Sequence, residues 1–142
     1  MAGYDNDNVF AKILRGELPA HKVYEDDKTF VFLDIMPRAP GHALIIPKAP
    51  ARNLLDVAPD DLAAVMATTQ KVARAAMKAF NAAGITMQQF NEPAGGQVVF
   101  HLHVHIIPRH EDVPLRAPAT FQETPENLAA HAEKLRAALN AG

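Results

Sequence analysis

The sequence predicts an α+β domain, in which one long helix, one or two shorter helices and a C-terminal helix pack on an antiparallel sheet of about five strands. Five short runs rich in β-branched and aromatic residues are bounded by Pro, Gly or Asp, which is typical of strands. Between and after these runs, three segments repeat apolar residues at helical spacing. The chain has 142 residues, 49% of them apolar and 21% charged, so we expect one globular domain over residues 1–142.

The first part of the chain predicts a short helix and three strands. Asn8 is a candidate N-cap for a helix that ends before Gly16 and carries Val9, Phe10, Ile13 and Leu14. Residues 22–25 and 29–33 have strand composition and are joined by an Asp-Asp turn. A loop rich in Pro and Gly over residues 34–41 then leads to a strand over residues 42–48.

The second part predicts the longest helix over residues 59–83. Its apolar stripe includes two methionines, which we interpret as core filler, and consists of Leu62, Val65, Met66, Thr69, Val72, Ala73, Ala76, Met77 and Phe80. A strand over residues 85–91 turns at residues 91–96 into an antiparallel strand that begins at Val98. A final helix begins near Thr124 and carries Leu128, Ala132, Leu135 and Leu139.

The strand predicted from Val98 contains His101, His103 and His105 at alternate positions. Strand side chains alternate between faces, so the three imidazoles share one face while the intervening apolar residues point to the core. No fold requires three imidazoles in a row. The arrangement therefore calls for a chemical explanation.

Three interpretations compete for the histidine row. It could be an incidental His-rich outer face, or a metal site that needs a further ligand, because only two neighbouring imidazoles converge easily on one zinc ion. It could also act on a phosphate, since a neutral imidazole is a good nucleophile near neutral pH. The adjoining Gly95 and Gly96 could expose backbone N–H groups as an anion-binding nest, which favours the phosphate interpretation.

Composition limits the partners and the location. A net charge of −2 argues against a protein that coats nucleic acid or a membrane surface. The absence of cysteine excludes disulfides and a thiol nucleophile. No apolar run approaches membrane-spanning length, and residues 1–8 lack the features of a secretory signal, so we expect a cytoplasmic protein.

Residues 101–107, with the order His-Leu-His-Val-His-Ile-Ile, resemble the signature of the histidine-triad (HIT) family. Residues 34–37 with 41–48, Asn91 with residues 95–97, and the opening helix at residues 9–19 also match this family in the right order. The resemblance covers a core of residues 8–109 and leaves residues 110–142 as a C-terminal extension. The chain is most similar to the bacterial Hint-like branch, which consists of nucleoside phosphoramidases that bind purine nucleotides.

The resemblance implies a role for each residue of the polar cluster. His103 matches the nucleophile that forms a covalent nucleotidyl-imidazole intermediate, and His105 matches a phosphate contact. His101 would fix the middle ring and serve the proton of the leaving group, and His42 would join the cluster. The remaining matches bind the nucleotide: Asp34 at the ribose hydroxyls, Phe10, Ile13 and Ile35 around the base, and Asn91, Gly96, Gln97 and Val98 near the phosphate and leaving group.

The resemblance also implies a homodimer joined through the long helix and the sheet edge, an AMP-type purine nucleotide as ligand, no cofactor and no metal. Two departures leave the substrate open. Val98 stands where many Hint proteins have Ser, and residues 107–109 are similar to the branch that hydrolyses dinucleoside polyphosphates. A dinucleoside polyphosphate hydrolase, or a nucleotide-binding regulatory protein with incidental hydrolysis, therefore remains an alternative.

Overall fold

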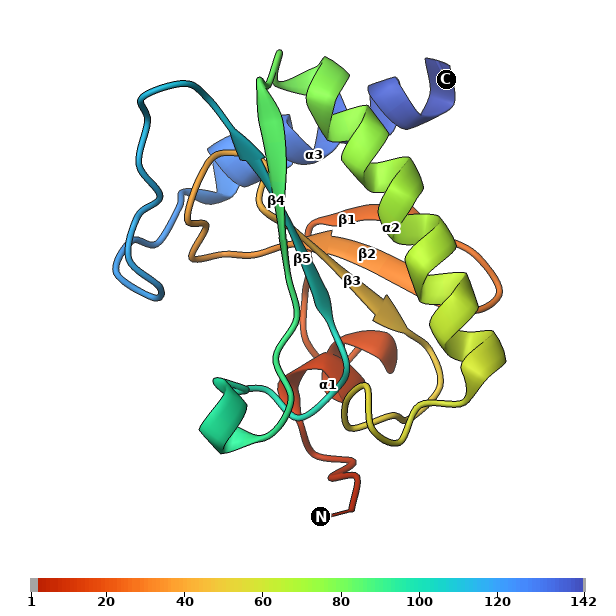
Figure 1. The fold of residues 1–142 in the computed structure, drawn as a ribbon. Coiled ribbons are helices and arrows are strands. Elements are labelled where there is room, and N and C mark those ends of the chain that lie inside the picture. Colours follow the sequence, from red (N-terminus) through yellow and green to blue (C-terminus); the bar gives the residue numbers. More distant parts are fainter. Residues whose placement is uncertain (1–2, 142) are drawn as a thin grey trace.

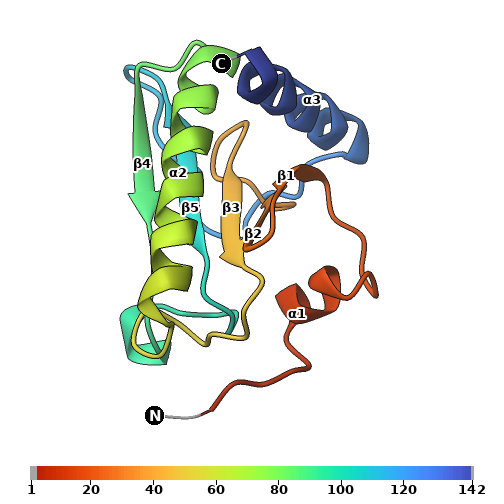
Figure 2. The same cartoon turned by 90° about the vertical axis from the view of Figure 1, so that its right-hand side faces the viewer.

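The computed structural model describes residues 3–141, so residues 1, 2 and 142, the ends of the predicted domain, lie outside the described residues. Figures 1 and 2 show a sheet with helices of unequal size on its two faces. The elements in chain order are α1 (Val9–Leu14), β1 (Lys22–Glu25), β2 (Thr29–Leu33), β3 (Ala43–Pro47), α2 (Pro59–Ala79), β4 (Gly84–Gln88), the short 3-10 helix η1 (Pro93–Gly95), β5 (Val104–Arg109) and α3 (Pro125–Ala141).

The five strands form one antiparallel sheet in the order β1-β2-β3-β5-β4, which confirms the predicted α+β class. The register places His105 of β5 between Leu44 of β3 and Gln88 of β4. Strands β1 and β4 are the two edges. Since β5 lies inside the sheet, its histidine is held by ladder hydrogen bonds on both sides.

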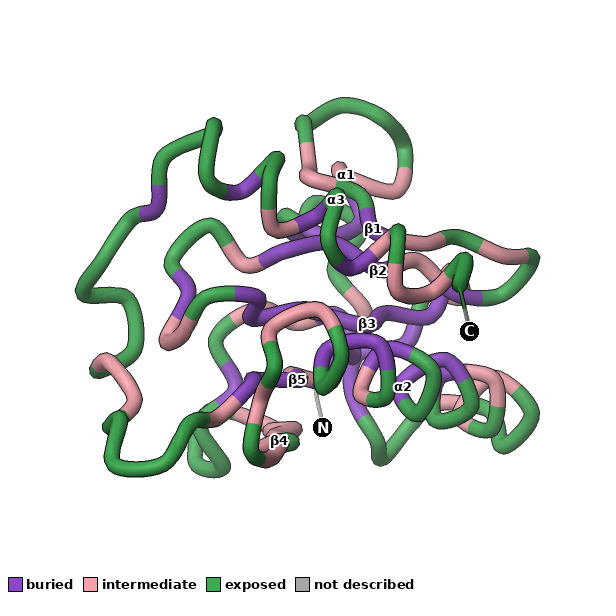
Figure 3. The backbone as a smooth tube through the Cα atoms, turned by 90° about the horizontal axis from the view of Figure 1, so that it is seen from above, coloured by how far each residue is buried: buried purple, intermediate pink, exposed green. Residues whose placement is uncertain are grey.

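One face of the sheet is covered by α2 and α3 (Figure 2). The buried residues there are almost all aliphatic and include Val31, Ile45, Val72, Val104 and Leu135. Those that belong to strands alternate with residues of the opposite face, as expected because successive strand side chains point to opposite sides of a sheet. Figure 3 shows the buried backbone concentrated in the central strands. This face contains the larger part of the hydrophobic core.

The opposite face is covered by α1 and by loops. A smaller cluster consists of Phe10, Phe32, Leu44 and Ile46, with Ile13 packed against it. Helix α1 has only six residues, and Asn8 caps it by accepting a hydrogen bond from the Ala11 N–H. So short a helix leaves part of this face accessible to a ligand.

Several predicted boundaries are confirmed. Strands β1 and β2 have the predicted ranges, and Asp26 shapes their turn by accepting hydrogen bonds from the backbone N–H groups of Lys28 and Thr29. Helix α3 begins at the predicted place because Thr124 accepts a hydrogen bond from the Asn127 N–H. None of the helices in residues 3–141 is long and apolar enough to cross a membrane.

Other boundaries were wrong. The long helix ends at Ala79 rather than residue 83, because Asn81 adopts a φ of 48°, which stops the helical turn. Strand β4 ends at Gln88 instead of residue 91. The methionines of α2 are not core filler, because Met66 and Met77 are each 39% exposed.

Candidate active site

Four histidines gather on the face that α2 and α3 leave open. His105 comes from β5, His42 directly precedes β3, and His101 and His103 lie in the segment that leads into β5. The ring centroids of His103 and His105 are 4.9 Å apart, and those of His42 and His105 are 5.1 Å apart. The structure therefore brings His42, which lies far from the triad in sequence, into the same cluster.

The prediction of a continuous strand from Val98 was wrong, because β5 begins only at Val104. Before that point the backbone leaves the ladder: the Leu102 N–H donates to the Ala51 carbonyl instead, at 2.9 Å. His101 and His103 consequently lie on a loop. Side-chain hydrogen bonds, rather than strand pairing, determine where their rings lie.

The protonated nitrogens of His42 and His105 follow from their hydrogen bonds. The Arg38 backbone N–H donates to His42 Nδ1 at 3.0 Å, so the proton of the neutral His42 ring must be on Nε2. That Nε2 lies 2.9 Å from His105 Nδ1 and donates to it. The remaining proton of His105 is then on Nε2, which makes Nε2 a hydrogen-bond donor toward the open face.

The same reasoning applies to His101 and His103. His101 Nε2 lies 2.8 Å from the Pro47 carbonyl oxygen, which can only accept, so Nε2 carries the proton. His103 Nδ1 lies 2.7 Å from the His101 carbonyl oxygen and must donate to it. The lone pair of His103 is therefore on Nε2, the nitrogen that faces away from the backbone.

Burial keeps all four rings neutral. Desolvation lowers the pKa of His42 and of His101 to about 4 and that of His105 to about 3, with smaller contributions from neighbouring charges. Desolvation also lowers the pKa of His103, partly opposed by its hydrogen bond to the His101 carbonyl. At neutral pH the cluster is a set of uncharged imidazoles with fixed proton positions.

Asp34 begins the loop between β2 and β3. One carboxylate oxygen accepts a hydrogen bond from the Met36 N–H at 2.9 Å, and the other lies 3.8 Å from His42 Nε2. Because His42 is neutral, this contact is no ion pair, and burial raises the pKa of Asp34. Ile35 follows with 48% of its surface exposed. Asp34, the predicted ribose residue, thus lies beside His42, and Ile35 is its exposed neighbour in the chain.

Residues of the C-terminal extension hold this loop in place. Arg38 Nε donates to the Arg116 carbonyl at 2.8 Å, and Arg116 in turn donates to the Pro37 carbonyl at 3.1 Å. The Glu123 N–H donates to the Ile35 carbonyl at 3.0 Å. The extension therefore belongs to the architecture of the site, a role that its polar sequence did not indicate.

Phe10 and Ile13 of α1 form the apolar side of the site. The Phe10 ring meets His103 edge to face, with centroids 4.9 Å apart and planes at 90°. Ile13 packs against the cluster that contains Phe10. An apolar wall beside a polar row is the usual composition of a small-molecule site.

The predicted anion nest at Gly95 and Gly96 was wrong. The Gly95 N–H donates to the Glu92 carbonyl and the Gly96 N–H to the Pro93 carbonyl, as part of the turn that contains η1. Both groups are therefore already used. Within residues 3–141, the backbone N–H groups that follow, from Val98 to His101, have no hydrogen-bond partner, and those of Val98 and Val99 are the first of them.

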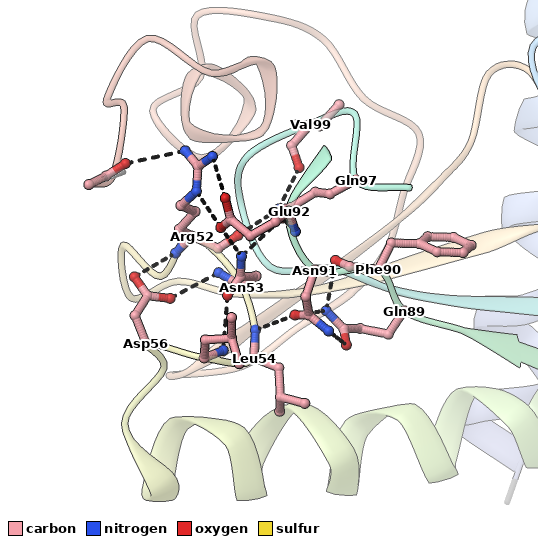
Figure 4. Close-up of polar contacts among 12 residues, drawn as sticks. Arg52, Asn53, Leu54, Asp56, Gln89, Phe90, Asn91, Glu92, Gln97 and Val99 are labelled. Carbon is pink, nitrogen blue, oxygen red and sulfur yellow. Dashed lines mark hydrogen bonds and ion pairs between the residues drawn. The ribbon is translucent and has the colours of Figure 1, made fainter. Parts of the chain in front are cut away.

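Gln97 is a structural residue of this loop rather than a ligand-facing one. It is 4% exposed, its amide nitrogen donates to the Arg52 and Val99 carbonyls, and its oxygen accepts from Asn53 Nδ2 and the Glu92 N–H. Figure 4 shows this network, which the sequence did not reveal. Its one sequence signal is an Arg-Asn pair in the loop between a strand and a helix.

Arg52 and Glu92 complete the network. Arg52 donates to both carboxylate oxygens of Glu92, at 2.8 and 3.0 Å, and its guanidinium group lies over the Phe100 ring. This pair holds Glu92 at a φ of 65°, an unfavourable value for a residue with a side chain. Asn91 lies beside it, where it pairs with the Gln89 amide and accepts a hydrogen bond from the Leu54 N–H.

The donor set closest to a metal site consists of Asp34, His42 and His105, whose ligand atoms all lie within 4.8 Å of one another. The two facing nitrogens of the histidines are 2.9 Å apart and share a proton. A cation could enter only if this hydrogen bond broke. The arrangement therefore suits hydrogen bonding to a substrate better than metal binding.

Comparisons with known proteins agree with this geometry. The family model described as HIT domain matches residues 15–112. The adenylylsulfatase HINT3 of Arabidopsis thaliana is 43% identical over 106 residues, which cover 75% of this chain and 54% of that protein. The chain thus spans about half the length of this relative.

Solved structures match over almost the whole chain. A Hit-like protein from Bartonella henselae, described as involved in cell-cycle regulation and crystallised with an unknown ligand, has a TM-score of 0.93 and 51% identity, over 96% of this chain and 99% of that one. A zinc-bound histidine triad family protein from Mycobacterium smegmatis has a TM-score of 0.83 and 34% identity, over 95% and 94% of the two chains.

Proposed function

The chain belongs to the HIT domain family of nucleotide-binding proteins, and from this premise we propose that it hydrolyses purine nucleoside phosphoramidates through a covalent intermediate on His103. The family includes nucleotide hydrolases, and the open face of the sheet has the groups that such a reaction needs. Residues 8–109 would form the catalytic core, and residues 110–142 would support it.

The observation that carries the proposal is the free nitrogen of His103. Its Nδ1–H is bound to the His101 carbonyl, so Nε2 has the lone pair. Within residues 3–141, no fully buried side-chain nitrogen or oxygen lacks a hydrogen-bond partner. Since Nε2 has no partner, it is reached from solvent. An accessible, unprotonated imidazole nitrogen is what nucleophilic attack on phosphorus requires.

In the first step, His103 Nε2 attacks the α-phosphorus, and the bond between phosphorus and the leaving amine breaks. The amine departs with a proton from solvent. Positive charge develops on the His103 ring, and the Nδ1–H donor shares that charge with the His101 carbonyl oxygen 2.7 Å away. In the second step, water attacks phosphorus, the bond to Nε2 breaks, and a nucleoside monophosphate leaves.

The non-bridging oxygens would be stabilised by donors already in place. The accessible Nε2–H of His105 is one, and the unpartnered N–H groups of Val98 and Val99 are the others. Preorganised donors of this kind usually make the largest contribution to such reactions. His101 is fully buried with its Nε2–H bound to Pro47, so we assign it to positioning rather than to proton transfer to the leaving group.

Asp34 would accept hydrogen bonds from the ribose hydroxyls, since a carboxylate is an acceptor only. Phe10, Ile13 and Ile35 would enclose the base, while Gly96, at a φ of 97°, lets the loop turn just before Val98 and Val99 in the chain. Asn91 and Gln97 would act by holding the loop, because most of their polar atoms are used within the protein.

The test is release of AMP from an adenosine phosphoramidate, measured for wild type and His103→Ala side by side. We expect steady release by wild type and a loss of at least about a thousandfold in the variant. Circular dichroism of the variant checks that it is folded. Turnover by His103→Ala within a few-fold of wild type would refute the assignment.

The leaving group is the open part of the proposal. The Arabidopsis relative is named an adenylylsulfatase, which favours adenylyl sulfate as a second substrate class for this chain. Diadenosine polyphosphates are the third substrate class, because residues 107–109 are similar to the branch that hydrolyses dinucleoside polyphosphates. Comparison of kcat/KM for the three substrates ranks them. A chain that binds AMP and turns over none of them would be a regulatory nucleotide-binding protein.

We also propose that the chain forms a homodimer through α2 and β4. Met66 and Met87 are 39% and 54% exposed, and together with Ile85 and Ala73 they line a hollow of about 450 Å³ beside the edge strand. A second copy would cover both the apolar surface and the strand edge. Sedimentation equilibrium should give a dimer for wild type and a monomer for Met87→Glu, and a monomeric wild type would contradict this.

A further inference from the structure

A contact from the N-terminal segment reaches the histidine cluster from outside the matched family region. Tyr4 precedes residues 15–112, and its hydroxyl lies 2.6 Å from His101 Nδ1. We propose that Tyr4 is a positioning residue for the nucleophile: it fixes the ring of His101, whose carbonyl fixes the ring of His103. This inference rests on the proposed function and extends it to a residue outside the stretch that the family model matches.

The direction of the hydrogen bond follows from the other side of the His101 ring. Nε2–H must donate to the Pro47 carbonyl, so Nδ1 is an acceptor and the Tyr4 O–H donates to it. If the proton were on Nδ1 instead, the lone pair of Nε2 would face the lone pairs of the Pro47 carbonyl oxygen at 2.8 Å. Tyr4 therefore supports one tautomer of His101 and one orientation of its ring.

The position of this ring matters because the backbone around it has few other restraints. Residues 98–103 lie outside the sheet ladder, and the Leu102 N–H bond to Ala51 is their backbone tie across the loop. His101 is anchored through both ring nitrogens instead. Those anchors determine where the His101 carbonyl lies, and hence which nitrogen of His103 carries the proton.

Burial makes the Tyr4 bond hard to replace. His101 has 0% of its surface exposed, and the Tyr4 ring meets its ring edge to face at 5.5 Å. If the hydroxyl were removed, water could reach Nδ1 only by displacing the aromatic ring. An unpartnered buried acceptor favours reorientation, which is the route by which the change would reach His103.

The segment that carries Tyr4, residues 3–8, is held at several points and is called the N-terminal strap here. The Gly3 carbonyl accepts a hydrogen bond from Arg52 at 3.4 Å, and the Asn6 carbonyl accepts one from Arg15 at 2.8 Å. Asn8 then caps α1. Figure 2 shows the strap continuing from α1 at the end of the sheet where the loops lie. Tyr4 is thus presented by a fixed backbone.

Two measurements test the proposal together. ¹⁵N NMR of the imidazoles in the resting protein reads the tautomers directly: wild type should show His103 protonated at Nδ1 and His101 at Nε2. In Tyr4→Phe, the His101 Nδ1 signal should shift and the His103 tautomer should become mixed. With an adenosine phosphoramidate, kcat should fall roughly five- to tenfold, the value of one hydrogen bond, with KM unchanged.

The chain offers two matched controls. Tyr24→Phe removes the other tyrosine hydroxyl, which donates to Asp26 away from the site, and should leave kcat and the histidine signals unchanged. Arg15→Ala loosens the middle of the strap and keeps the Tyr4 hydroxyl. It should lower kcat less than Tyr4→Phe does.

Three outcomes would overturn the proposal: unchanged histidine signals in Tyr4→Phe, a rise in KM in place of the fall in kcat, or equal losses in Tyr4→Phe and Arg15→Ala. The last result would assign the effect to the strap as a whole. If wild type turned over none of the substrates, the proposed function would fail. The NMR signals would still decide whether Tyr4 fixes the two tautomers.

Discussion

The two faces of the sheet differ in what holds them together. On the face covered by α2 and α3, most buried side chains are aliphatic, and one buried hydrogen bond joins the hydroxyls of Thr29 and Thr68. On the open face, three buried imidazoles and the half-buried ring of His105 are connected by hydrogen bonds to backbone groups, to one another and to Tyr4. Both faces are built on the same strands. Along β5, alternation separates Val104 and Ile106, which pack in the core, from His105, which we propose contacts the substrate.

This comparison predicts that changes on the helix-covered face affect stability more than turnover. Ile45 is fully buried there, and Ile45→Ala should lower the free energy of unfolding by about 2–5 kcal/mol. Activity per folded molecule should stay within a few-fold. Urea denaturation and AMP release measure the two quantities, and Ile45→Val, at about 0.5–1.5 kcal/mol, gives the graded control. If activity fell by more than the fraction of unfolded protein explains, the helix-covered face would also contribute to turnover, and the comparison would fail.

On the open face, a single substitution should lower both the free energy of unfolding and the rate of AMP release. Gln97→Ala removes the acceptor of the Glu92 N–H and one of the two acceptors of Asn53 Nδ2, which costs about 1–3 kcal/mol of unfolding free energy. Since the loop then no longer holds its N–H donors in place, AMP release should fall at least about tenfold. Gln122→Ala, at an exposed position, is the control and should change neither. Full activity in Gln97→Ala would show that the network does not position the loop.

Acid should destabilise the open face selectively. An unfolded histidine titrates near 6.5, whereas burial holds the pKa of His42 and His101 at about 4 and that of His105 at about 3. Between these values the unfolded chain binds more protons than the folded one. The free energy of unfolding should therefore fall as pH drops from about 6.5 to 4, by about 1.4 kcal/mol per pH unit for each such histidine.

Denaturation midpoints measured from pH 7 down to pH 4.5 check this slope. His42→Gln removes one of the buried titrating groups and should make the slope shallower. A stability that stays constant across this range would mean that the rings are already charged in the folded protein.

The smallest effect is expected at Val98, which is 84% exposed. Val98→Ser should change the free energy of unfolding by less than about 0.5 kcal/mol, because the side chain has little packing to lose. It should alter the ratio of kcat/KM for phosphoramidate and adenylyl sulfate substrates by a few-fold. An unchanged ratio would place the leaving group away from this residue.

The predictability of the two faces also differs. The helix-covered face follows from periodicity: the apolar stripe of α2 and the ranges of β1 and β2 could be predicted from local sequence. Errors there were the exposed methionines of α2, the end of this helix, where Asn81 takes a positive φ, and the end of β4. Apart from these errors, the spacing of apolar residues along the chain is enough to predict which of them are buried on this face.

The open face depends on contacts between distant residues, which no local pattern contains. The histidine row was visible in the sequence, but the break in β5 before Val104 follows from hydrogen bonds to Pro47 and Ala51. The glycine turn consumes its own N–H groups, so composition alone suggested a nest in the wrong place. Tyr4 gave no signal, because a single residue in a loop has no periodicity.

The central claim is that His103 Nε2 is the atom that bonds to phosphorus. Wild-type protein mixed with an adenosine phosphoramidate, quenched in base within the first turnover and digested, should give the peptide that contains His103 with an added adenylyl group. The quench must be basic because the bond between phosphorus and the imidazole nitrogen hydrolyses in acid. The same peptide from His103→Ala should have no addition. Continued AMP release with no adduct on the wild-type peptide would contradict the account.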